Sequence, residues 1–206
     1  MFFLSEIEHA LMLPPHLLNL PIDDAIKGEL DSLFLDKVIG ELGLCVSVYD
    51  IRSIEGGFVF PNDGASTYTV KFRLVMFRPF VGEVISAKLK ESTKDGLRLS
   101  IGFFDDIYVP VPLLTSPNHS EPNPAYKLCL DGVVWYWEYD GANYPIDGED
   151  EIRFRVHNIS YPPIPLDQDI VSGENDSQQK ESKPFAPMVV TGALDDDGLG
   201  PISWWV

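Results

Sequence analysis

The chain has 206 residues, of which 45% are hydrophobic and 12% aromatic, and its formal net charge is −17 at pH 7. These values are typical of a folded protein with one large or two small domains, and they exclude a disordered chain. Cys45 and Cys129 are too few for a disulfide framework, so we expect two reduced thiols inside the cell. The apolar start contains Glu6 and Glu8 but no basic segment, and no apolar run reaches membrane-spanning length. We therefore expect neither a signal peptide nor a membrane protein.

The first eighty residues predict a small α+β domain. A helix is expected at 22–39, because Pro21 precedes it, Asp23 and Asp24 suit the positive end of the helix dipole, and Gly40 can end it. The expected strands are apolar or alternate apolar with polar residues, and they cover 2–13, 44–51, 58–60 and 68–77.

After Pro79 the pattern becomes all-β, and we place a domain boundary between residues 80 and 81. The segment 115–124, rich in Pro and Asn, predicts a loop, and 161–184, rich in Pro, Ser, Gln and acidic residues, predicts a disordered insertion. The expected strands are short and separated by turns, and they cover 81–90, 97–104, 107–109, 133–139, 152–157 and 188–194. The predicted fold class is therefore α+β, with a small α+β domain at 1–80 and an all-β OB-fold barrel at 81–206.

A basic segment stands out in this acidic chain. Residues 71–98 contain seven Lys and Arg against three Asp and Glu, so this segment carries +4 and the rest of the chain −21. Alternation in the two strands around the turn at Lys94 to Gly96 places four side chains together outside the barrel: Lys88, Lys90, Arg98 and Phe104. Cations for phosphate and an aromatic ring for stacking predict binding of a single-stranded nucleic acid. The alternative is an ordinary solvated strand face, where Lys is common.

Catalytic patterns are weak throughout. We find no glycine-rich phosphate loop and no nucleophile elbow, and the four histidines show no metal-ligand spacing. The run Asp195-Asp196-Asp197 is the basis for a metal-dependent hydrolase as a further alternative. Three consecutive carboxylates do not converge on one ion unaided, however, so a solvated turn is the better interpretation. We therefore expect no enzyme activity, no cofactor and no bound metal.

Several separate motifs occur in an order that resembles a known family. They are the start Met1-Phe2-x-Leu4 with Pro14-Pro15, the loop 59–66, the junction Phe77-Arg78-Pro79-Phe80, the segment 102–107 and the end 198–205. Together they resemble the larger stalk subunit of eukaryotic RNA polymerases, most closely that of RNA polymerase III, and they span nearly the whole chain. The resemblance implies a ribonucleoprotein-like tip domain before the OB-fold domain.

The resemblance also implies a role, partners and sites. It implies a non-catalytic nuclear subunit that forms a heterodimer with a small helical stalk subunit and docks on core RNA polymerase III through the tip domain. It further implies contacts of the outer domain with initiation factors and single-stranded nascent RNA. The core-polymerase contact would be the loop Phe60, Pro61, Asn62, Asp63, Gly64 and Ala65, and the RNA contact would be Lys88, Lys90, Arg98 and Phe104.

One departure from the family pattern affects the RNA contact. After Gly96 the chain has Leu97-Arg98-Leu99, where related OB modules carry an aromatic pair. This predicts a smaller stacking surface. The second function hypothesis is a free single-stranded RNA-binding OB-fold protein, which the net charge of −17 disfavours because phosphates are repelled.

Overall fold

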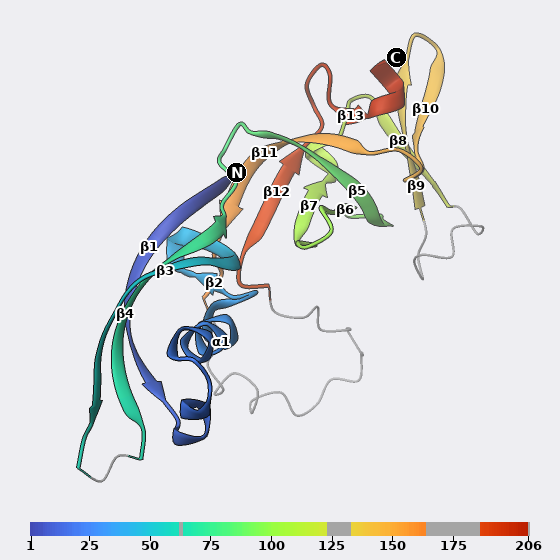
Figure 1. Cartoon of the computed structure of the whole chain (residues 1–206). Helices are drawn as coiled ribbons and strands as arrows, with labels where there is room; N and C mark the ends of the chain where they lie inside the picture. The colour runs from blue at the N-terminus through green and yellow to red at the C-terminus, as the bar shows by residue number, and fades with distance from the viewer. Residues whose placement is uncertain (62–63, 123–132, 164–185, 206) are drawn as a thin grey trace. The chain divides into compact units, whose positions relative to one another are not determined.

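The computed structural model describes residues 1–61, 64–122, 133–163 and 186–205 (Figure 1). The chain divides into two compact units, Met1–Pro79 and Phe80–Val206. Within the described ranges, no helix is both long enough and apolar enough to cross a membrane.

The first unit is a four-stranded antiparallel sheet with one helix packed on it. The elements are β1 (Phe2–Leu13), α1 (Ile22–Phe34), β2 (Val38–Ile39), β3 (Gly43–Val59) and β4 (Ser66–Phe77), and the strand order is β1-β4-β3-β2. The core lies between α1 and the sheet. Ile26 and Leu30 of the helix and Phe72 and Met76 of β4 are fully buried there, so the helix and the sheet hold each other through their apolar sides.

The helix is shorter than expected. It ends at Phe34 rather than at residue 39, because Leu35 is extended and Asp36 has a left-handed φ of 57°. The two residues of β2 then pair with the start of β3, with Val38 opposite Leu44. The prediction of a helix over 22–39 is thus wrong in its last five residues, because strand pairing outweighs the helical pattern there.

The third strand is longer than expected. Residues 44–51 and 58–60 were predicted as separate strands, but β3 runs without interruption along β4. Four register shifts interrupt its alternation, and Gly56 and Gly57 both have positive φ. Bulges of this kind break the period of two from which a strand is recognised in sequence.

The second unit contains a closed barrel. Its described strands are β5 (Val84–Thr93), β6 (Gly96–Ser100), β7 (Ile107–Pro110), β8 (Asn118–Pro122), β9 (Val133–Tyr139), β10 (Ala142–Ile146), β11 (Ile152–Ser160), β12 (Val189–Ala193) and β13 (Gly200–Pro201). One sheet has the order β12-β7-β6-β5-β11-β13, and a pairing between β12 and β11 closes the ring. β7 and β12 are parallel, and the other pairs are antiparallel. A five-stranded barrel of this kind confirms the predicted OB-type architecture and the α+β class.

A smaller sheet is inserted between β7 and β11, with the order β10-β9-β8. The expected loop at 115–124 is therefore wrong for 118–122, which pairs with β9. The Trp135 indole of β9 donates a hydrogen bond of 3.0 Å to the Thr93 carbonyl, which ties this sheet to the barrel strand β5.

Two predictions concern residues that the structure describes only in part. Most of the segment 161–184, which was predicted to be disordered, lies outside the described residues. Of the two cysteines, Cys45 is free and buried, and Cys129 lies outside the described residues.

Candidate functional site

Three of the four side chains predicted to contact RNA come together on one face of the barrel. Strand pairing sets Lys88 opposite Ser100 and Glu91 opposite Arg98. Lys88 and Lys90 are exposed on β5, and Arg98 is partly buried on β6. The alternation in sequence therefore placed the cations correctly on the outside of the barrel. Their exposure does not test whether they bind RNA, which stays a prediction.

The fourth predicted side chain is not on this face. Phe104 is 7% exposed, whereas its neighbour Phe103 is 47% exposed. The strand ends at Ser100, Gly102 has a φ of 93°, and the Ile101 amide donates to the Phe104 carbonyl at 3.1 Å. The chain turns here, so the alternation that placed Phe104 outside does not continue. The prediction of Phe104 as an exposed stacking residue is wrong.

Two of the three cations of this face, Lys90 and Arg98, bind carboxylates of the same unit. Lys90 forms an ion pair with Asp105, whose carboxylate also accepts a hydrogen bond from the Ser100 hydroxyl. Arg98 Nη2 lies 3.0 Å from Asp106 Oδ1, and Arg98 Nε donates to the Asp105 carbonyl at 3.1 Å. The hydrogen bond from Lys90, followed by that from Ser100, holds the pKa of Asp105 below its usual value.

Tyr108 supplies the aromatic ring that Phe104 does not. It lies opposite Arg98 in the β6–β7 pairing, and the Arg98 guanidinium carbon lies 5.5 Å from the ring centroid. Partial burial raises the pKa of Tyr108. In OB-folds the second and third strands form the nucleic-acid face, and these strands are β6 and β7 here. The alternation of buried Ile107 and Val109 around Tyr108 could have revealed this residue in the sequence.

We call this surface the barrel face and define it by Lys88, Lys90, Arg98, Tyr108, Asp105 and Asp106. Beside it lies a cavity of about 390 Å³ whose lining includes Thr93, Lys94, Arg98 and Tyr108. Together, the barrel face and the lining of this cavity carry four positive charges, from Lys88, Lys90, Lys94 and Arg98, and four negative charges, from Glu91, Asp95, Asp105 and Asp106. These charges nearly cancel, so we expect this surface to bind phosphates only weakly.

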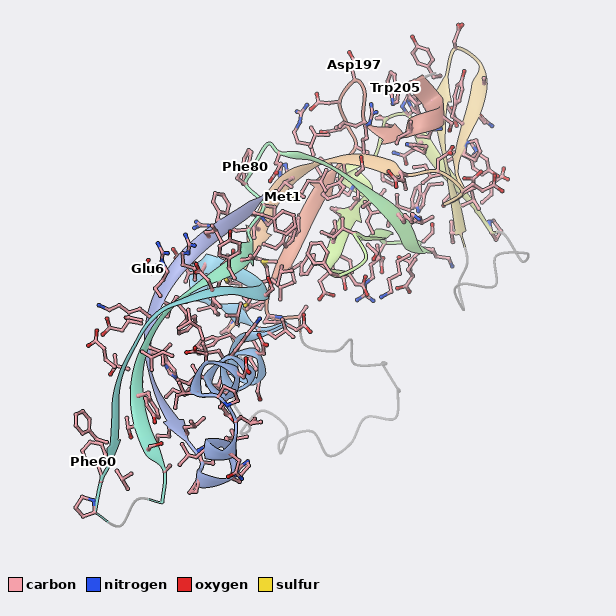
Figure 2. The ribbon with its side chains drawn as sticks, viewed as in Figure 1. Met1, Glu6, Phe60, Phe80, Asp197 and Trp205 are labelled. Atoms are coloured by element: carbon pink, nitrogen blue, oxygen red, sulfur yellow. The ribbon has the colours of Figure 1, made fainter. Side chains whose placement is uncertain are left out.

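The loop predicted to contact the polymerase lies at the turn between β3 and β4, and Figure 2 shows Phe60 at the far end of these strands. Phe58, Val59 and Phe60 are 70%, 65% and 55% exposed, and we call these three residues the hairpin tip. Pro61 and Gly64 are also exposed and Ala65 is partly buried, whereas Asn62 and Asp63 lie outside the described residues. Consecutive exposed apolar side chains of this size are typical of interaction surfaces.

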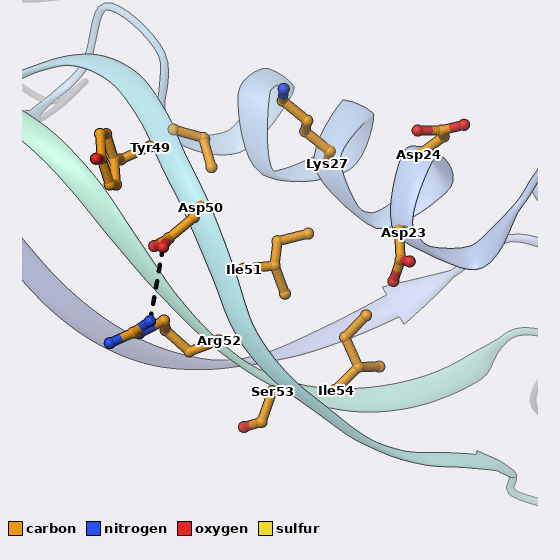
Figure 3. Close-up of a pocket in the computed structure, with 10 residues that line it drawn as sticks. Asp23, Asp24, Lys27, Tyr49, Asp50, Ile51, Arg52, Ser53 and Ile54 are labelled. Carbon is orange, nitrogen blue, oxygen red and sulfur yellow. Dashed lines mark ion pairs between the residues drawn. The ribbon is translucent and has the colours of Figure 1, made fainter.

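A groove between α1 and β3 was not found from the sequence (Figure 3). Its volume is about 530 Å³, and its lining combines Asp23, Asp24 and Lys27 of the helix with Tyr49, Asp50, Ile51, Arg52, Ser53 and Ile54 of β3. Asp50 accepts two hydrogen bonds from Arg73, of 2.7 and 2.5 Å, which lower the pKa of its carboxyl group. Within the described part of the chain, no strand pairs with this edge of β3 beyond Cys45.

The acidic run considered as a metal site is already engaged in an ion pair with another strand. Asp196 binds Arg155 of β11. In the ranges that the structure describes, no group of three or more His, Cys, Asp or Glu side chains is placed to hold a metal ion. A hydrolase built on Asp195 to Asp197 gains no support from this geometry.

Two family models match the chain, one on each unit. The model described as "RNA polymerase III subunit Rpc25" matches residues 83–205. The model described as "SHS2 domain found in N terminus of Rpb7p/Rpc25p/MJ0397" matches residues 8–64. The first of these models alone covers more than half of the chain.

Individual relatives agree with these matches. The chain is 35% identical to DNA-directed RNA polymerase III subunit RPC8 of Bos taurus over all of this chain and 98% of that protein. It is 30% identical to the Saccharomyces cerevisiae subunit RPC8 over the full length of both. It is also 30% identical to DNA-directed RNA polymerase II subunit RPB7 of Saccharomyces cerevisiae, over 50% of this chain and 61% of that protein. The chain belongs to the Rpc25 family of RNA polymerase III subunits.

Proposed function

We propose that this chain is the larger stalk subunit of RNA polymerase III and acts there without catalytic chemistry. It forms a heterodimer with the small helical stalk subunit, joins the core polymerase in the nucleus and supports initiation. The observation that carries this proposal is the identity of 35% to a polymerase III subunit along the whole chain, through both units.

The hairpin tip supports a contact with the core polymerase. Burying a Phe side chain in an interface contributes about 1.5–3 kcal/mol to the free energy of association. Phe58 and Phe60 are mostly exposed in their own unit, so most of this free energy is still available for binding a partner. A rigid scaffold that exposes apolar side chains at a hairpin end suits insertion into a partner.

The groove between α1 and β3 supports a contact with the small stalk subunit. It combines an unpaired strand edge with Asp23 and Asp24, so it offers main-chain hydrogen bonds and a negative charge to a partner segment. The three residues of the hairpin tip are apolar and carry no charge. The two surfaces therefore suit two different partners.

The barrel face supports weak contact with nascent RNA. Tyr108 supplies a ring, and Lys88 is exposed, but Lys90 and Arg98 bind Asp105 and Asp106. Such a face gains occupancy when the polymerase holds it close to the emerging transcript, because attachment raises the effective concentration. A free RNA-binding protein lacks this advantage, so the stalk subunit is the better-supported function.

The test is affinity purification of the tagged full chain from its own cells. We expect the core polymerase III subunits and the small stalk subunit to co-purify with the wild-type chain. A double variant, Phe58→Ser with Phe60→Ser, should lose core subunits at least tenfold while it keeps the small stalk subunit. Leu35→Ser, which changes an exposed apolar side chain elsewhere in the same unit, is the matched control and should retain both.

The two parts of this proposal fail in different ways. If polymerase III subunits are absent from the wild-type sample, the proposed function is wrong. If they are present with the wild-type chain and equally present with the double variant, the function stands and the hairpin tip is not the contact. Loss of the small stalk subunit in Asp23→Lys with Asp24→Lys, with Glu41→Lys unaffected, would place that partner at the groove.

A further inference from the structure

The acidic run Asp195 to Asp197 lies against tryptophan rings. A cavity of about 130 Å³ at this place is lined by Trp137, Trp205, all three aspartates, Thr115 and Ser116. Figure 2 labels Asp197 and Trp205 at the same end of the second unit. Neither the resemblance nor the proposed function assigns a role to this cavity, which we call the Trp–Asp cavity.

The aromatic walls are held in place by their own contacts. Trp137 of β9 lies 5.2 Å from the ring of Trp204 and 6.2 Å from that of Trp205, between ring centroids. The Trp205 indole donates a hydrogen bond of 2.8 Å to the Leu199 carbonyl. Gly200 has a φ of 97°, and a Cβ atom there would lie 2.6 Å from the Trp204 ring, so glycine lets that ring lie against the backbone. The walls therefore exist before any ligand arrives.

The charge at the opening is negative. Asp196 binds Arg155, but no described residue forms an ion pair or a side-chain hydrogen bond with the Asp195 or Asp197 carboxylate. Both side chains belong to exposed residues. The ion pair with Arg155 shows that a guanidinium group can bind this run of carboxylates, and two further carboxylates are available beside it.

These properties select one class of occupant. Small-molecule sites usually measure about 300–1,000 Å³, so this cavity suits one side chain rather than a cofactor. Three carboxylates repel phosphate and carboxylate groups. Indole faces attract cations, and they also contact the methylene stem that lysine and arginine carry. We propose that the Trp–Asp cavity binds a lysine or arginine side chain of a partner polypeptide.

The test uses the full chain with 15N-labelled tryptophan, in the stalk heterodimer if the chain requires its partner. The probe is Nα-acetyl-lysine methylamide, and the readout is the set of indole N–H signals in NMR spectra, assigned with Trp→Phe variants. We expect saturable shifts of the Trp137 and Trp205 signals. Trp135 is 6% exposed and donates to Thr93, so its signal should stay in place and serve as a control within the molecule.

Charge and location are tested separately. The neutral analogue Nα-acetyl-norleucine methylamide should cause no saturable shift. The double variant Asp195→Asn with Asp197→Asn should weaken lysine binding by roughly fivefold, as for removal of two exposed charges. The matched control, Glu149→Gln with Asp150→Asn, removes the same charge elsewhere in the unit and should bind as the wild type does.

The proposal is overturned if norleucine and lysine shift the two signals equally, if Trp135 shifts as much as Trp137, or if no shift occurs. It is also overturned if the aspartate variant keeps a native Trp135 signal and binds lysine as the wild type does. Should that variant unfold, the comparison of lysine with norleucine on the wild-type chain still decides the question. Repeating the titration with the arginine analogue determines which of the two side chains the cavity prefers.

Discussion

At the hairpin tip, Phe58, Val59 and Phe60 expose more than half of their surface, whereas on the barrel face Lys90 and Arg98 bind carboxylates of their own unit. The residue pattern alone pointed to the basic segment as the most unusual feature of the sequence, whereas the family resemblance pointed to polymerase contact through the first domain. Exposed apolar rings gain free energy only when a partner covers them. Cations that already have partners must release them before they bind phosphate. Exposure alone therefore does not identify an interface, and the contacts already made at a surface have to be counted first.

The largest expected effect separates buried from exposed phenylalanine in the first unit. Phe72→Ala should lower the free energy of unfolding by about 3–5 kcal/mol, because Phe72 is fully buried. Phe58→Ala should change it by less than about 0.5 kcal/mol, because the side chain lies mainly in solvent. Urea unfolding followed by circular dichroism measures both. All four tryptophans belong to the second unit, so their fluorescence reports unfolding of that unit separately. A large destabilisation by Phe58→Ala would show that the hairpin tip is part of the core.

An intermediate effect is expected when the cations of the barrel face are released. Asp105→Asn with Asp106→Asn removes the carboxylate that pairs with Lys90 and the nearer of the two that pair with Arg98, so single-stranded RNA should bind more tightly. Two additional phosphate contacts should steepen the salt dependence, log K against log salt, by about 1.4. Fluorescence anisotropy of a labelled oligouridylate over a range of salt concentrations measures this slope. Glu149→Gln with Asp150→Asn controls for net charge, and equal slopes in the two double variants would mean that the ion pairs do not limit RNA binding.

The smallest expected effect concerns pH. The pKa of Asp105 is lowered by the hydrogen bond from Lys90, so the pair stabilises the fold above the ordinary Asp pKa of about 3.9 and loses this effect as pH falls through the lower folded value. The wild type should be more stable than Asp105→Asn by less than about 1 kcal/mol at pH 7, because the pair is partly exposed. This difference should stay constant down to about pH 5 and shrink below about pH 4. Urea unfolding of both proteins at several pH values measures it, and a difference that grows on acidification would contradict the ion pair.

Much of the fold could be predicted from the sequence where the pattern is local. β1 and β9 begin and end at the predicted residues, because proline or Asp-Gly turns bound them. The end of α1 could not be predicted, since the left-handed Asp36 and the pairing of Val38 with Leu44 depend on the neighbouring strand. β8 was missed because its residues are polar or proline, so no apolar alternation marks the strand that pairs with β9.

The candidate site was predictable to a similar degree. Lys88, Lys90 and Arg98 were placed outside correctly from alternation alone. The prediction that Phe104 is exposed was wrong because the turn at Gly102 ends the alternation. Tyr108 was overlooked although its strand was expected. The ion pairs of Lys90 and Arg98 follow from the turn that brings Asp105 and Asp106 back to the barrel face. The spacing of residues in the sequence did not indicate that Asp105 and Asp106 lie beside Lys90 and Arg98. The roles of these residues in RNA binding and of residues 60–65 in polymerase contact stay predictions.

The closure of the barrel has a consequence for synthesis of the protein. β12 lies between β7 and β11, so both of these strands keep an unpaired edge until residue 193 has left the ribosome. The first unit is complete in sequence at Pro79 and can fold long before that point. A nascent or prematurely terminated chain that stops between β11 and β12 therefore carries a finished first unit joined to an open sheet. Open strand edges pair readily with other chains, so such products should depend on chaperones and aggregate without them.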